Sequence, residues 1–163
     1  FAKSVFVKTQ IRYAVSDAQN AEELLGDFVS ELQGLASADP ALCDTALLIH
    51  PHVLRDFLDY NDFLDLADAA IAELGLDGEI QVASFHPDYQ FAGTSSTDID
   101  NYTNRSPYPV LHLLRETSIE RAVAAFPDAS DIYEKNIETL RRIGLEGWHA
   151  LGLAAVETPP NKK

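Results

Sequence analysis

Hydrophobic and polar residues follow two different periods in the first half of the chain. Apolar residues recur at intervals of three and four over residues 20–36 and 56–74, which predicts two amphipathic helices. Period-two alternation over residues 5–15 predicts a long or bent strand, and the apolar run 45–50 predicts a strand covered on both faces. Residues 79–85 predict a third strand. The order strand, helix, strand, helix, strand predicts right-handed crossovers and a mostly parallel sheet.

The pattern loses its period after the third predicted strand. Residues 88–109 are rich in Asp, Asn, Ser, Thr, Tyr, Gly and Pro, which predicts a long loop, and loops of this length are usually functional or mobile. The last third favours helices. We expect a short helix over 111–116, a second beginning at Thr117, whose spacing to Glu120 matches a capping box, and a third from Ser130 to Gly144.

These elements predict a single α/β domain over residues 1–157 and a flexible tail over 158–163. The domain would contain a small, mostly parallel sheet of at least three strands, in βαβαβ order, flanked by helices and followed by a helical C-terminal third. Phe1 is not an initiator residue and the chain contains no methionine, so we expect the natural N-terminus to lie upstream.

Composition limits the classes of partner. Of the 163 residues, 46% are hydrophobic, which suffices for a core, whereas 12 basic against 26 acidic side chains give a net charge of −14. This balance disfavours binding to nucleic acid or anionic lipid through a basic surface. No apolar run approaches the roughly 20 residues of a membrane span. Cys43 is the only cysteine, which excludes an intrachain disulfide and fits a cytoplasmic protein.

Histidines follow two of the predicted strands. His50 and His52 flank Pro51 after one strand, and His86 precedes Pro87 after the next. If these strands are parallel neighbours, the three imidazoles meet at the carboxyl edge of the sheet, where α/β proteins bind ligands. They could bind a divalent metal such as zinc or supply a general base. The alternative is that these histidines only terminate strands and pack there.

The long loop surrounds one cation with aromatic and amide side chains. Arg105 is the only basic residue between Arg55 and Arg115, so it is a candidate clamp for a carboxylate or phosphate. The alternative is an ion pair with Asp98 or Asp100. Other candidates for orienting a ligand lie in this loop or in the first turn of the second predicted helix: Tyr60, Asn61, Tyr89, Asn101 and Asn104.

Several enzyme motifs are absent, including the Gly-x-Ser-x-Gly elbow, Cys-x-x-Cys, His-Glu-x-x-His, the dinucleotide fingerprint and the Walker loop. We therefore expect a site for a small anionic metabolite at the carboxyl edge of the sheet. The site would belong to a hydrolase or transferase in which the histidines act. The alternative is a non-catalytic binding or assembly module, and possible homo-oligomer, that uses the loop over residues 88–109 as its contact surface.

Four strings of residues resemble a known family. They are LLIHPH at 47–52, DFLDYNDFL at 56–64, ASFHPDYQFAGT at 83–94 and NYTNRSPYP at 101–109. Together they are similar to the bacterial domain-of-unknown-function 1415 family, and the resemblance runs from Phe1 to about Trp148. It implies a bacterial, cytosolic protein with no established activity. It also implies a Cys-Pro pair and a helical segment upstream of Phe1, so a thiol-dependent activity is a third hypothesis.

Overall fold

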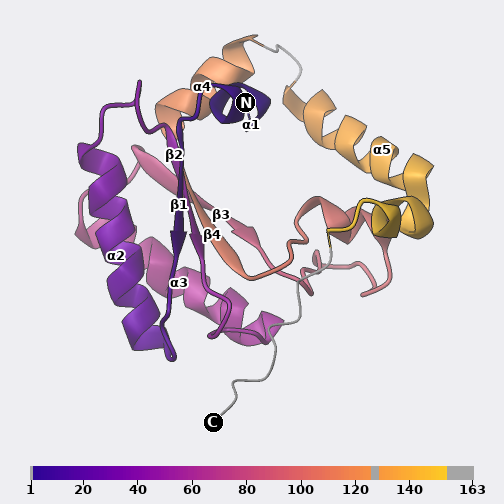
Figure 1. The fold of residues 1–163 in the computed structure, drawn as a ribbon, viewed down its shortest axis with the longest axis horizontal. Helices are drawn as coiled ribbons and strands as arrows, with labels where there is room; N and C mark the ends of the chain where they lie inside the picture. The colour runs from indigo at the N-terminus through magenta and orange to yellow at the C-terminus, as the bar shows by residue number, and fades with distance from the viewer. Residues whose placement is uncertain (1, 126–128, 154–163) are drawn as a thin grey trace.

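One mixed four-stranded sheet organises the part of the chain that the structure, a computed structural model, describes, namely residues 2–125 and 129–153. Two long helices pack on one face of this sheet, and the C-terminal helix lies on the other side of the molecule (Figure 1). The predicted tail at 158–163 lies outside the described residues. The elements in chain order are α1 (Ala2–Val7), β1 (Ile11–Val15), α2 (Ala21–Ser37), β2 (Thr45–Ile49), α3 (Phe57–Glu73), β3 (Ile80–Phe85), the 3-10 helix η1 (Ile99–Thr103), β4 (Val110–Arg115), α4 (Glu116–Ala125) and α5 (Ala129–Ala150).

The strand order is β1-β2-β4-β3, so the prediction of a mostly parallel sheet is wrong. Only β1 and β2 pair in parallel, whereas β4 pairs antiparallel to both β2 and β3. The segment predicted as a short helix over 111–116 instead forms β4, one of the two inner strands of the sheet. Two of its three leucines, Leu111 and Leu113, are fully buried, and the gain from pairing on both sides outweighs the helical preference of leucine. Because β2 and β3 both oppose β4, they still point the same way and end at the same edge.

The first predicted strand, residues 5–15, divides into α1 and β1. The turn between them has Thr9 at a φ of 56°, and the amides of Thr9 and Gln10 donate to the carbonyls of Phe6 and Val5. Val5 is buried in this arrangement. The period-two alternation of apolar residues continues across this turn, and no glycine or proline marks the turn in the sequence. The sequence pattern alone therefore indicates one strand.

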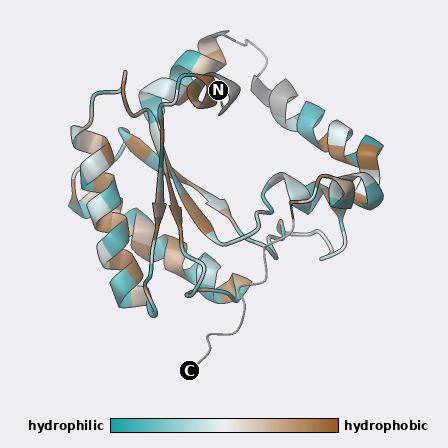
Figure 2. Cartoon of the chain, viewed as in Figure 1, coloured by the Kyte–Doolittle hydropathy of each residue, from teal (hydrophilic) through white to brown (hydrophobic). Residues whose placement is uncertain are grey.

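The core lies between α2, α3 and the covered face of the sheet, and the predicted helices 20–36 and 56–74 are confirmed within a residue or two. Brown and teal bands alternate along both helices in Figure 2, as expected for elements that are apolar on one side. The fully or almost fully buried side chains of this layer include Leu24, Phe28, Leu32, Leu35, Leu48, Tyr60, Phe63, Ala67, Leu111 and Leu113.

Asp56 caps the N-terminus of α3. Its carboxylate accepts hydrogen bonds from the amides of Leu58 at 2.8 Å and Asp59 at 3.3 Å. We expect Asp56→Ala to lower the free energy of unfolding by about 1 kcal/mol, because two amides of the first turn lose their acceptor. Urea denaturation measures this loss, and Asp62→Ala, at an exposed position inside the same helix, is the matched control. Equal effects of the two substitutions would contradict the role of the cap.

The C-terminal helices follow the sheet. α4 begins directly after β4, and α5 is interrupted at Gly144, where a φ of 63° breaks the helical path close to the predicted end. α5 packs against η1 (Figure 1), and two contacts join them: an ion pair between Arg141 and Asp100, and edge-to-face packing of Trp148 on Tyr102. The last turns of α5 are thereby brought to the long loop. Within the described residues, no helix combines the length and apolar character needed to cross a membrane.

Candidate functional site

His50 and His86 lie at the same edge of the sheet, as predicted, but inside the protein. Both side chains are 0% exposed. β4 separates their strands, and each histidine is tied by its amide to the chain beside it: His50 donates to the carbonyl of Pro109, and His86 donates to that of Asn104. The two residues therefore join β2 and β3 to the segment that leads into β4.

The His86 ring uses both of its nitrogens inside the protein. Nε2 donates to the carbonyl of Leu54 at 3.2 Å, and Nδ1 accepts from the amide of Asp88 at 3.0 Å. This pattern requires the neutral tautomer with its proton on Nε2. Burial lowers the pKa of His86, which keeps the ring neutral. His86 thus links the turn before α3 to the start of the long loop.

The His50 ring has one nitrogen without a partner. Nδ1 lies 3.1 Å from the carbonyl of Val53 and donates to it, whereas Nε2 is buried and has no hydrogen-bond partner within the described chain. Burial, with a smaller effect of the nearby His86, lowers the pKa of His50 to about 4. A neutral ring buried in this way cannot meet a substrate without a rearrangement of the edge.

Tyr60 connects these histidines to the sheet. Its ring stacks on His50 with centroids 5.8 Å apart and lies 5.1 Å from the ring of His86. Its hydroxyl donates to the carbonyl of Val110 at 2.8 Å and accepts from the amide of Phe85 at 3.1 Å. Phe85 and Val110 are register partners at the end of the β3–β4 ladder, so the hydroxyl bridges the point where these strands separate. Burial raises the pKa of Tyr60, which therefore stays protonated.

His52 and Asn61, by contrast, are exposed at the surface. Over residues 2–125 and 129–153, no group of three or more His, Cys, Asp or Glu side chains is placed to hold a metal ion. The described geometry therefore does not assemble His50, His52 and His86 into the predicted three-histidine centre. Catalysis by these residues stays a prediction.

The predicted amide residues of the loop organise the loop itself. Asn101 is fully buried; its Oδ1 accepts from the amide of Phe91 and the hydroxyl of Thr94, and its Nδ2 donates to the carbonyl of Ser95. Asn104 donates to the carbonyl of Ser84 at the end of β3. Together with η1, these bonds hold the backbone around Arg105 in a defined path.

Arg105 is fixed without a carboxylate partner. Its Nε donates to the carbonyl of Tyr89 at 3.2 Å and its Nη2 to that of Ser96 at 2.7 Å, while its Cζ lies 4.4 Å from the centroid of the Tyr102 ring. Asp98 instead accepts from Ser95, and Asp100 pairs with Arg141. The guanidinium is therefore half-buried and oriented, and its charge is unpaired within the described chain.

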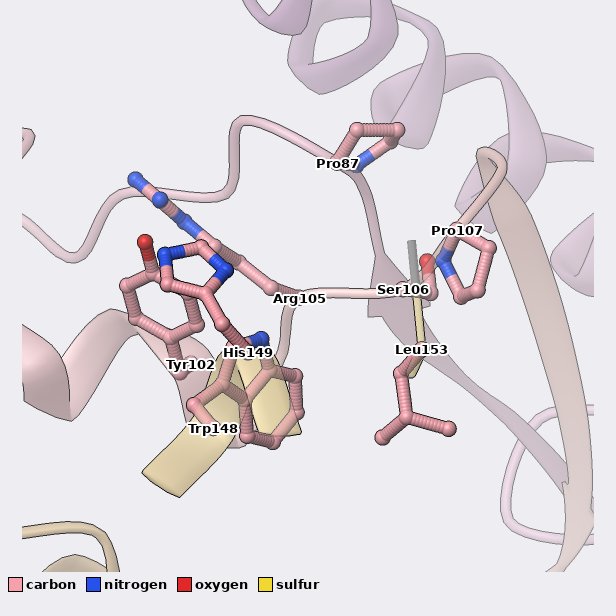
Figure 3. A pocket seen from close by; sticks show the side chains of 8 residues that line it. All are labelled: Pro87, Tyr102, Arg105, Ser106, Pro107, Trp148, His149 and Leu153. Carbon is pink, nitrogen blue, oxygen red and sulfur yellow. The ribbon is translucent and has the colours of Figure 1, made fainter. Parts of the chain in front are cut away.

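A pocket of about 230 Å³ lies beside Arg105 and is called the Arg105 pocket below. Figure 3 shows the rings of Tyr102, Trp148 and His149 on the same side as the guanidinium, and Ser106 and Pro107 on the opposite side. The residues that line the pocket are Pro87, Tyr102, Arg105, Ser106, Pro107, Trp148, His149 and Leu153. Pro87 and Pro107 place it next to the carboxyl end of β3, at the predicted edge of the sheet.

Trp148 and His149 are the side chains of this pocket that the sequence pattern did not indicate. They follow Gly144 on the last turns of α5 and reach the loop only because α5 folds back onto η1. The available signal was a Trp-His pair after a helix-breaking glycine, which is also typical of ordinary packing at a chain end. The pocket thus combines Arg105, an imidazole and two aromatic rings, which is a chemistry suited to an anion with an apolar part.

Comparison with known proteins gives a family but no characterised relative. No curated protein and no solved structure matches the chain. The family model described as "Protein of unknown function (DUF1415)" matches residues 1–150, which cover every residue of the Arg105 pocket except Leu153. The chain belongs to the DUF1415 family.

Proposed function

We propose that this protein binds a small anionic molecule in the Arg105 pocket. One observation carries the proposal: a guanidinium is held in place by two backbone carbonyls and an aromatic ring, and no carboxylate of the described chain neutralises it. A guanidinium has five N–H donors, and Arg105 uses two of them internally. In a chain with a net charge of −14, such an unpaired cation is a specific feature of the surface.

The surroundings of Arg105 favour a carboxylate or phosphate that carries an apolar group. Tyr102 and Trp148 pack edge to face with centroids 5.3 Å apart and present aromatic surface beside the cation. The buried His50 and His86 do not line this pocket, so the proposal concerns binding, and the hydrolase or transferase chemistry of the histidines stays a separate prediction.

Benzoate and its uncharged analogue benzamide test the proposal. We expect benzoate to bind more tightly than benzamide, and Arg105→Gln to weaken benzoate binding about tenfold or more, because a charge-assisted hydrogen bond contributes about 1.5–3 kcal/mol. Titration calorimetry at low and high salt measures both effects, and salt should weaken benzoate alone.

Arg55→Gln is the matched control, since Arg55 is exposed and does not line the pocket. Thermal melting of Arg105→Gln checks that the loop stays folded, and Arg105→Lys should restore part of the affinity by restoring the charge. Equal affinity for benzoate and benzamide, or an unchanged affinity in Arg105→Gln, would refute the proposal. In that case light scattering on Tyr102→Ala would test the alternative of an assembly module at residues 88–109.

A further inference from the structure

The face of the sheet opposite α2 and α3 carries a second and larger cavity. This groove, called the sheet groove below, has a volume of about 620 Å³ and lies over β1, β2, β4 and the end of β3. Side chains alternate between the two faces of a strand, so residues at every second position share its floor. The residues that form its floor and ends include Ile11, Thr45, Leu47, Phe85, Val110 and His112.

The sheet groove is uncharged. Among the described residues, no Lys, Arg, Asp or Glu lines the groove, and His112 is the one lining residue whose ordinary pKa lies near neutral pH. The Thr45 hydroxyl donates its proton to the carbonyl of Leu113 at 2.6 Å, so it must accept from His112 Nε2, which lies 2.7 Å away. This bond fixes a neutral tautomer, and burial lowers the pKa of His112 to about 4. An ion bound only in this groove would therefore find no counter-charge.

The sheet groove and the Arg105 pocket adjoin. Ser106 lines both, and the β3 exit passes from one to the other, because Phe85 lines the groove while Pro87 lines the pocket. In Figure 3, Ser106 lies across the pocket from the guanidinium of Arg105. A molecule that places its anionic group at Arg105 and extends past Ser106 would enter the apolar groove.

We propose that the ligand is an amphipathic anion, an aliphatic carboxylate whose head group binds Arg105 and whose hydrocarbon chain lies in the sheet groove. This inference rests on the proposed function of the Arg105 pocket and names its ligand class. The groove offers apolar side chains, and β2 and β4 beneath its middle are paired on both sides, so a hydrocarbon chain suits its floor better than an extended peptide with amides to satisfy. The net charge of −14 disfavours both a second copy of the chain and an anionic membrane as its occupant.

A chain-length series tests the inference on the protein as it stands. The probes are butyrate, hexanoate, octanoate and decanoate below their micellar concentrations, with 1-octanol as the uncharged analogue. We expect the affinity to rise about fourfold for each methylene that enters the groove. Arg105→Gln should weaken every carboxylate by a similar factor and leave the dependence on chain length intact. Octanol should show no response to this substitution.

Leu47→Gln tests the groove separately. Leu47 is half-buried on the floor of the groove, and a polar group there should reduce the gain per methylene while leaving benzoate binding unchanged. Leu58→Gln, at an exposed position on α3, is the matched control, and Tyr13→Gln at the exposed rim is a second groove variant if Leu47→Gln does not fold.

The outcomes separate the two proposals. Benzoate binding that depends on Arg105, together with no dependence on chain length, would overturn the amphipathic ligand and leave the anion site standing. Loss of both effects would refute the proposed function itself. Two other results would also overturn the inference. If the protein co-sediments with phosphatidylglycerol vesicles but does not bind free carboxylates, a membrane occupies the groove. If the protein is a dimer that Tyr13→Gln dissociates, a second copy occupies it.

Discussion

Between pH 6.5 and pH 4 the protein is expected to lose a large part of its stability, because the buried His50 and His86 and the half-buried His112 are neutral in the folded state. Burial lowers the pKa of both His50 and His112 from 6.5 to about 4. In that range the unfolded state binds more protons than the folded state, so the free energy of unfolding falls as the pH falls. The full contribution is present above about pH 6.5, and the loss for each histidine reaches about 3 kcal/mol at pH 4. A typical domain has only roughly 5–15 kcal/mol of stability to lose.

Urea unfolding at a series of pH values measures this slope. His112→Gln should make it shallower, because the glutamine amide can still donate to the Thr45 hydroxyl but does not titrate. His52→Gln, which changes an exposed histidine, is the matched control and should leave the slope unchanged. A slope that is the same in His112→Gln and in the parent protein would show that His112 does not contribute to the acid sensitivity.

Tyr60→Phe is expected to lower the free energy of unfolding by about 2 kcal/mol although it removes a single oxygen atom. The hydroxyl satisfies the amide of Phe85 and the carbonyl of Val110 where β3 and β4 separate, and phenylalanine would leave both groups without this partner in the core. Chemical denaturation measures the loss. Hydrogen exchange should place the increased opening at the amide of Phe85.

Tyr13→Phe provides the comparison, because Tyr13 is 59% exposed and the same change there should be nearly neutral. A small effect of Tyr60→Phe with unchanged protection of Phe85 would mean that water replaces the hydroxyl, and the bridging role would then be rejected.

The elements with strong periodicity could be predicted from the sequence, and those defined by position in the fold could not. The stripes of α2 and α3, and the short apolar runs of β2 and β3, each extend over enough residues to indicate one structure. The segment Val110–Arg115 is short and rich in leucine, and its strand conformation depends on insertion between β2 and β3, which lie far from it in the chain. Pairing partners of this kind leave no periodic signal.

The candidate site, like the fold, could be predicted from the sequence only in part. Arg105 could be found because it is an isolated cation in an acidic chain. Among the described residues it has no acidic partner and donates to backbone carbonyls instead, which agrees with that reasoning. Trp148 and His149 were missed because their proximity to Arg105 depends on the docking of α5 on η1. The sequence also placed His50 and His86 at one edge of the sheet, but their burial depends on the covering loop and on the ring of Tyr60.

The position of β4 between β2 and β3 has a consequence for how the protein folds during synthesis. β1, α2 and β2 form a parallel unit from neighbouring parts of the chain, but β3 has only one strand neighbour, and that neighbour follows it in the sequence beyond the long loop. β3 therefore leaves the ribosome before its partner exists and must wait, with apolar surface exposed, until Arg115 has been made. Formation of the sheet would then be limited by closure of the 88–109 loop, since non-local pairing is slow and leaves unpaired strands open to aggregation. Substitutions that loosen this loop should lower the yield of folded protein before they change the finished structure.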